Sequence, residues 1–188
     1  MLSFDIGVAL KKSGSSLDAK LLEAFIRVES GGKGFDAKTG KILIQFEPVW
    51  FKKMQPYAPS GAWSVNKVEV QSKEWIAFNN AFDINPVSAM ESTSIGLPQI
   101  MGFHWKRLGY NSVGHMWSAF KESLIEQICA LIRLIETDKN LLKAFQEKDY
   151  HNMAMFYNGS GYMAQAHRLG IKPYNEQIRD TYQSLLRV

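Results

Sequence analysis

The stretch "FIRVESGG" at residues 25–32 ends the first segment of the chain that has clear helical periodicity. Apolar side chains upstream recur on one helical face, which predicts a helix over 16–30 capped by Ser15 or Ser16. The two glycines then permit the left-handed conformation that commonly ends a helix. Glu29 therefore falls where the buried face meets the helix C-terminus, although the partial negative charge there disfavours a carboxylate. Such a misplaced charge indicates either a solvated, frayed helix end or a functional site.

The composition is that of an ordinary globular protein, with 46% hydrophobic and 21% charged residues in a chain of 188. This length predicts one domain over 1–188. A single cysteine, Cys129, excludes an intramolecular disulfide, and its apolar surroundings in the sequence favour a buried, inert thiol. A net charge of +4 is compatible with solubility, with nucleic acid or with an anionic polymer such as the bacterial cell wall. The absence of a dense basic cluster argues against nucleic acid.

The N-terminal segment does not resemble a signal peptide, because Asp5 interrupts a short apolar stretch and the lysines follow it. No run is long and charge-free enough to cross a membrane. We therefore expect synthesis in the cytoplasm, with action outside it only after export or membrane permeabilisation. The histidines lack ligand spacing, so no metal site is expected. They are His104, His115, His151 and His167.

The periodicity of the chain predicts a mainly α protein with one small β element after the first helix. Thr39 and Gly40 indicate a turn, and β-branched residues over 41–47 predict a strand or hairpin that Pro48 ends. The region 52–73 is expected to be mostly loop with a short helix. Further helices are predicted over 72–82, from 86 after an Asn85 cap, and over 98–108, 112–137, 139–147, 150–157 and 174–186.

Four short motifs follow one another along the chain. They are "VESGGKGF" at 28–35, "FE" at 46–47, "GLPQIMG" at 96–102 and "YNGSGY" at 157–162. In this order they resemble the N-acetylmuramidase family of phage endolysins, and more distantly the goose-type lysozymes and soluble lytic transglycosylases. The resemblance covers about residues 21–186. It implies a lysozyme-like, mainly α (α+β) fold with a small β-hairpin or sheet after the first catalytic helix.

The family resemblance also implies a function. A muramidase hydrolyses the β-1,4 bond between N-acetylmuramic acid and N-acetylglucosamine in peptidoglycan glycan strands, here for bacterial cell lysis. We expect one catalytic domain over 1–188, without the wall-binding module that some relatives carry, acting as a monomer with no cofactor and no nucleic acid. Glu29 suits the general acid, because burial and a helix C-terminus both raise the pKa of a carboxyl group.

The resemblance places the second acidic residue at Glu47, the end of the predicted strand. This residue could activate water, stabilise the positive charge of the transition state or only hold the loop, and a surface ion pair is the ordinary alternative. Ser94, Gln99, Tyr157 and Asn158 are expected to position the glycan, since amides offer both donors and acceptors to N-acetyl and hydroxyl groups. Turn formation is the alternative for Ser94 and Gln99, and core packing is the alternative for Tyr157.

Two other functions share the same motifs. A lytic transglycosylase uses one catalytic glutamate and forms 1,6-anhydromuramic acid products, and only Glu47 argues against it. A non-catalytic wall-binding module would grip the glycan without cleaving it. Trp50 and Trp63 flank loops and could stack on sugars, whereas the remaining tryptophans are expected in the core.

Overall fold

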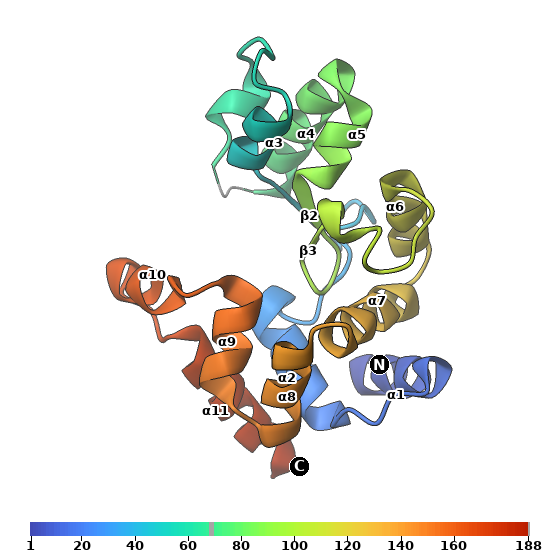
Figure 1. Cartoon of the computed structure of the whole chain (residues 1–188), viewed down its shortest axis with the longest axis vertical. Coiled ribbons are helices and arrows are strands. Elements are labelled where there is room, and N and C mark those ends of the chain that lie inside the picture. Colours follow the sequence, from blue (N-terminus) through green and yellow to red (C-terminus); the bar gives the residue numbers. More distant parts are fainter. Residues whose placement is uncertain (68–69, 188) are drawn as a thin grey trace. The chain divides into compact units, whose positions relative to one another are not determined.

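The computed structural model describes residues 1–67 and 70–187, which form two compact units (Figure 1). We call the first, made of residues 1–32 and 128–187, the helical unit, and the second, made of residues 33–127, the sheet unit. The single catalytic domain expected over 1–188 stays a prediction. Within the described residues, no helix is both long and apolar enough to cross a membrane.

The helical unit is built around α2. Its helices are α1 (Leu2–Ser13), α2 (Ala19–Ser30), the part of α7 (Leu124–Glu136) from Ile128 onward, α8 (Lys139–Glu147), α9 (Tyr150–Asn158), α10 (Tyr162–Leu169) and α11 (Tyr174–Leu186). Helix α2 contacts α1 and α11, and α9 contacts α8, α10 and α11. The predicted apolar stripe of α2 is confirmed, because Leu21, Leu22 and Phe25 are all fully buried.

The two ends of α2 differ in how well the sequence predicted them. At the C-terminus, Gly31 takes the expected left-handed conformation, with φ of 64°. At the N-terminus the expected cap at Ser15 or Ser16 is wrong, because the Asp18 side chain accepts two hydrogen bonds from backbone N–H groups of the first turn. Ser15 instead accepts from the backbone N–H of Leu17.

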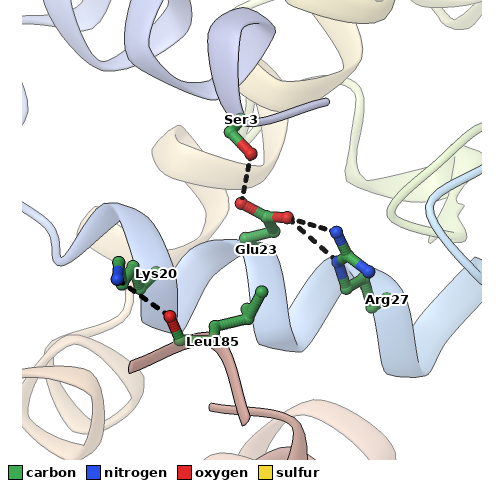
Figure 2. A network of polar contacts seen from close by, with 5 residues as sticks. All are labelled: Ser3, Lys20, Glu23, Arg27 and Leu185. Carbon is green, nitrogen blue, oxygen red and sulfur yellow. Dashed lines mark hydrogen bonds and ion pairs between the residues drawn. The ribbon is translucent and has the colours of Figure 1, made fainter. Parts of the chain in front are cut away.

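Polar contacts tie the N-terminal end of α2 to the C-terminal end of α11. Tyr182 donates its hydroxyl hydrogen to Asp18 Oδ2 at 2.6 Å. Lys20 Nζ donates to the backbone carbonyl of Leu185 at 2.8 Å (Figure 2). The two helices therefore run antiparallel, and the first residue of α11 lies at the end of α2 that carries Glu29.

The sheet unit combines a small sheet with short helices. Its elements are β1 (Ile44–Phe46), α3 (Pro48–Met54), the 3-10 helix η1 (Ala62–Val65), α4 (Gln71–Ile84), α5 (Pro86–Glu91), β2 (Thr93–Ile95), β3 (Ile100–Met101), the 3-10 helix η2 (Gly102–His104), α6 (Val113–Glu122) and the first residues of α7. The three strands pair antiparallel in the order β1-β2-β3. The register places Ser94 opposite Gln45 on one side and Met101 on the other.

The mainly α fold with a small inserted sheet is thus confirmed, but several helix predictions are wrong. The predicted helix over 98–108 is replaced by β3 and η2. The segment does not form an α-helix. Gln99 has a positive φ of 49°, which is not a helical conformation. A Cβ on Gly102 would lie 2.0 Å from the Met90 carbonyl oxygen. Residue 102 thus passes directly against backbone, which only glycine allows.

The long helix predicted over 112–137 is two helices, α6 and α7. Ser123 between them is extended, with φ of −154°, and its hydroxyl accepts a hydrogen bond from the backbone N–H of Ile125. A serine side chain that bonds the nearby backbone competes with helix continuation, which explains the break. The sequence reading also missed α1 and α10, and Pro48 begins α3 instead of only ending the strand.

Candidate active site

In the helical unit, the site is built around Phe25. This ring is fully buried, one helical turn before Glu29 on the same face of α2. Three aromatic rings contact it, with centroid distances of 5.2 Å to Phe145, 4.7 Å to Tyr157 and 6.0 Å to Tyr174. Helices α8, α9 and α11 therefore converge on the last turns of α2, and the apolar packing surrounds the place where Glu29 stands.

Two polar groups reach the Glu29 carboxyl group. The hydroxyl of Tyr174, the first residue of α11, donates to Oε1. The side chain of Asn158, the last residue of α9, also hydrogen-bonds the carboxyl group. Glu29 as a residue is partly exposed, although its carboxyl group is held by these two partners. Such a group can meet a substrate atom without leaving its partners.

The cation nearest to Glu29 in sequence is turned away from it. Arg27 donates two hydrogen bonds to Glu23 Oε1, at 3.0 Å and 2.6 Å, on the preceding turn of α2 (Figure 2). Glu23 also accepts from Ser3 of α1 at 2.8 Å. This network commits Arg27 to the other side of the helix, so its charge does not stabilise an ionised Glu29.

Burial raises the pKa of Glu29 from 4.5 to about 8, and the hydrogen bond from Asn158 lowers it only in part. Burial likewise raises the pKa of Tyr157 well above its usual value, and the negative charge of an ionised Glu29 adds to this effect. Both groups therefore hold their protons at neutral pH. A carboxyl group of this kind is loaded for proton transfer to a leaving oxygen, as in glycosidases.

In the sheet unit, Glu47 stands at the junction of β1 and α3, directly before Pro48 at the first helical position. Its backbone N–H donates to the Ser92 carbonyl at 2.9 Å, and its Oε1 accepts from Gln45 Nε2 at 2.7 Å. Burial raises the pKa of Glu47, the hydrogen bond from Gln45 lowers it, and the charge of Glu74 raises it. Glu47 is thus a partly buried carboxyl group with a fixed backbone.

Ser94 of β2 and Gln99 of the turn between β2 and β3 form one hydrogen-bonded group. The Ser94 hydroxyl lies 3.2 Å from Gln99 Oε1 and 3.4 Å from the Gln45 carbonyl oxygen. Gln99 Nε2 donates to the Gly96 carbonyl at 2.7 Å. Ser94 is buried and Gln99 is partly exposed, so a buried serine orients the amide of a residue that solvent reaches. Its second N–H and lone pair remain suited to a glycan N-acetyl or hydroxyl group.

The turn that presents Gln99 depends on a residue that the sequence reading missed. Gln127, fully buried, accepts from the Leu97 backbone N–H at 2.6 Å and donates to the Phe120 carbonyl at 2.7 Å. A Cβ on Gly96 would lie 2.7 Å from Gln127 Oε1, so the glycine also makes room for this amide. A polar residue inside an apolar helical pattern was the available signal.

The six predicted site residues fall into two groups. Glu29, Tyr157 and Asn158 come together in the helical unit, whereas Glu47, Ser94 and Gln99 belong to the sheet unit. Sequence reasoning missed Tyr174 and Gln45. Tyr174 lies directly after Pro173 at a predicted helix start, and Gln45 is a polar residue between two buried strand positions.

The expectation for Trp63 is wrong. Its side chain is only 3% exposed, and its indole Nε1 donates to the Pro59 carbonyl at 2.8 Å, so it is a core residue. Trp50 is 39% exposed and lies beside Phe103, with Lys53 Nζ 4.4 Å from its ring centroid. Across the part of the chain that the structure describes, no three His, Cys, Asp or Glu side chains are grouped to hold a metal. The absence of a metal site stays a prediction.

A mainly helical fold with a small antiparallel sheet, and a glutamate near the end of α2 whose pKa is raised by burial, is compatible with a glycan-cleaving enzyme. The profile of the N-acetylmuramidase family matches residues 18–186, and the chain therefore belongs to this family. Among solved structures it is similar to the endolysin of Burkholderia phage AP3, with 29% sequence identity and a TM-score of 0.79. That match covers 98% of this chain and 70% of the other. No match was found among curated proteins.

The family match and the structural match together identify this chain as a muramidase of the phage-endolysin type in the lysozyme-like superfamily. It is accordingly a peptidoglycan hydrolase, and the bacterial cell wall is where it acts.

Proposed function

We propose that the protein hydrolyses the β-1,4 bond between N-acetylmuramic acid and N-acetylglucosamine, with Glu29 as the general acid. Glu29 gives its proton to the glycosidic oxygen while the bond from that oxygen to the anomeric carbon breaks. Water attacks the anomeric carbon and gives a proton to Glu47. The products are two shorter glycans, one with a hydrated reducing end.

The observation that carries this proposal is the state of Glu29. Its pKa is raised to about 8 by burial, and its carboxyl group is held by Tyr174 and Asn158 while the side chain stays partly exposed. An acid of this kind is protonated at neutral pH, where most glutamates are not. Helix α2 thus tolerates a locally unfavourable residue because the chemistry requires it.

The remaining predicted residues have supporting parts in the proposal. Tyr157 packs on Phe25 and shields Glu29 from water, and Asn158 limits how far the pKa of the acid rises. Gln99, oriented by Ser94, offers hydrogen bonds to the glycan. We expect a monomer that reaches the wall after membrane permeabilisation or export, in keeping with a role in cell lysis.

One observation favours a second candidate, a lytic transglycosylase. The Glu29 group is complete within the helical unit, with a tyrosine and an asparagine on a single carboxyl group. A transglycosylase needs one such glutamate, and the 6-hydroxyl of the muramic acid takes the place of water. Under that mechanism Glu47 takes no part in proton transfer.

Digestion of purified sacculi separates these functions. Mass spectrometry should find hydrated reducing ends, and products made in H₂¹⁸O should carry the label. Glu29→Gln should slow release of fragments by about a hundredfold to ten-thousandfold, the range for losing a general acid. Glu147→Gln, the same change on an exposed glutamate of the helical unit, is the matched control and should stay at wild-type rate.

Unlabelled 1,6-anhydro ends would assign the protein to the transglycosylases instead. Fragment release by Glu29→Gln at the rate of the control would remove Glu29 from the mechanism altogether.

A further inference from the structure

We propose that Glu74 is a positioning residue for Glu47: its buried carboxylate fastens the end of β1 and brings a second negative charge to the strand end that Glu47 directly follows. The proposal rests on the proposed function only for the part that Glu47 plays in proton transfer. The fastening of the strand and the charge are properties of the sheet unit alone.

Side chains of α4 form hydrogen bonds with backbone groups on the edge of β1 that does not pair with β2. Gln71 Oε1 accepts from the Ile44 backbone N–H at 3.0 Å, and its Nε2 donates to the Ile44 carbonyl at 2.8 Å. Glu74 Oε2, one helical turn further on, accepts from the Phe46 backbone N–H at 2.8 Å. Residues three apart share a helix face, and residues two apart share a strand edge. Side chains of helix α4 therefore make hydrogen bonds to β1 at the positions where the backbone of a further strand would make them.

Asn66 completes the fastening at the end of the strand. Its Nδ2 lies 3.2 Å from the Phe46 carbonyl oxygen and 3.0 Å from Glu74 Oε2. Both polar backbone atoms of Phe46 thus bond to this pair of side chains. The next residue is Glu47, whose own N–H is held by the Ser92 carbonyl of the chain segment entering β2. The backbone that carries the Glu47 side chain is therefore fixed on both sides.

An amide oxygen at position 74 would accept the same two hydrogen bonds without a charge. Glu74 is only 1% exposed, and burying a carboxylate in place of a neutral amide costs free energy of folding. The hydrogen bonds to the strand therefore do not require a charge at position 74. The charge of Glu74 raises the pKa of Glu47 and so makes the ionised Glu47 a stronger proton acceptor.

The groups that act on the Glu47 carboxyl group come from β1 and α4. Gln45 of β1 donates to it, and the charge of Glu74 from α4 raises its pKa. The cations of α3 lie in its last turn, where Lys53 is placed over the Trp50 ring. In α5, Glu91 Oε1 accepts from Trp105 Nε1 at 2.7 Å. Among the described residues, Glu74 is the charged group whose effect on the pKa of Glu47 is resolved.

The test compares a variant that removes the charge with one that removes the fastening. Glu74→Gln keeps an acceptor for Phe46 but is neutral, whereas Gln71→Met removes both hydrogen bonds to Ile44 and changes no charge. Carbon-13 NMR of the side-chain carboxyl groups gives the titration midpoint of Glu47, whose resonance is assigned by its loss in Glu47→Gln. The pH profile of fragment release from sacculi is recorded for each variant.

In Glu74→Gln, the Glu47 midpoint should move to lower pH by about half a unit to one unit, as expected for loss of a neighbouring like charge. The acid limb of the activity profile should move with it. Gln71→Met should lower the melting temperature and leave the Glu47 midpoint in place. An unmoved midpoint in Glu74→Gln, or an equal movement in both variants, would overturn the proposal.

The NMR result does not depend on activity, which separates this proposal from the proposed function. If Glu29→Gln releases fragments normally, the proposed function fails, whatever the Glu47 midpoint does. If the midpoint moves but the acid limb does not, Glu47 takes no part in proton transfer, and Glu74 is then no positioning residue for the reaction.

Discussion

Glu29 lies in the last turn of a helix near aromatic rings, whereas Glu47 directly follows a strand and is influenced by the Gln45 amide and by the carboxylate of Glu74. The pKa of both is raised, and burial is the largest cause in each case. The surroundings then differ. The helical unit keeps water away with the rings of Phe25, Tyr157 and Tyr174, and the sheet unit fixes backbone with buried amide and carboxylate side chains.

In the proposed mechanism, this difference separates two carboxyl groups that have two different tasks. Aromatic packing changes little when a single polar partner is lost, so we expect the pKa of Glu29 to stay raised by burial. A lattice of hydrogen bonds fixes position more tightly but depends on every member. We therefore expect substitutions around Glu29 to act mainly on proton affinity, and substitutions around Glu47 to act mainly on structure.

The largest expected effect is a difference in how Glu29→Gln and Glu47→Gln respond to a substrate with a better leaving group. On a natural glycan, Glu29→Gln should lose about a hundredfold to ten-thousandfold in rate, because the sugar oxygen leaves only when protonated. An aryl glycoside of a wall-type oligosaccharide needs no such proton, so Glu29→Gln should recover most of its rate there. Glu47→Gln should stay slow on both substrates. The measurement is the kcat of each variant on each substrate.

Equal recovery of both variants on the aryl glycoside would contradict the separate tasks. Wild-type rates for Glu47→Gln on the natural glycan would leave Glu29 as the sole carboxyl group of the mechanism.

The next effect tests the dependence of the sheet unit on buried amides. Gln127→Leu should leave the Leu97 N–H and the Phe120 carbonyl without their partner, and each buried unpaired group costs about 1–3 kcal/mol. We expect the free energy of unfolding to fall by about 4 kcal/mol in urea titration. Gln165→Leu, on an exposed position of α10, is the control and should change it by less than about 0.5 kcal/mol. Equal effects would refute the role given to Gln127.

The same contrast explains what the sequence could predict. Glu29 was identifiable because its misfit is local: a carboxylate, a helix end and two glycines lie within one turn. The caps at Asn85 and Gly31 were identifiable for the same reason. Motif resemblance supplied the candidates in the sheet unit, since nothing local marks Ser94 or Gln99 as special.

The missed features depend on contacts between residues far apart in the chain. Tyr174 reaches Glu29 across 145 positions, and Gln127 holds Leu97 across 30. The wrong helix over 98–108 has the same origin, because pairing of β3 with β2 overrides the local preference of that segment. Periodicity detects an amphipathic face but not the partner that the face meets.

A smaller effect concerns stability rather than activity. The pKa of Glu29 is about 8 in the folded state and 4.5 as its ordinary value, so the folded state binds the proton more tightly. Its stabilising contribution is therefore complete below pH 4.5 and is lost as the pH rises through 8. Glu29→Gln does not ionise, so its free energy of unfolding should exceed that of the wild type by roughly 2–4 kcal/mol at about pH 9.

Thermal melts of both proteins between about pH 4 and pH 9 measure this difference. The melting temperatures should nearly coincide at the acid end and separate through the neutral range. A constant offset at every pH would mean that the carboxyl group of Glu29 titrates normally in the folded protein, contrary to its burial among the rings.

The smallest effect concerns Tyr174, the partner of Glu29 that the sequence reading missed. Its hydroxyl donates to Glu29 Oε1, and a donor stabilises the ionised form, so Tyr174→Phe should raise the pKa of Glu29. The alkaline limb of the lysis profile should then move upward by about half a pH unit, with kcat at neutral pH nearly unchanged. Tyr182→Phe, which removes a hydroxyl at the other end of α11, should lower the melting temperature without moving that limb. A downward movement in Tyr174→Phe would mean that the hydroxyl supports the protonated acid, and the aromatic packing alone would then not account for the proton on Glu29.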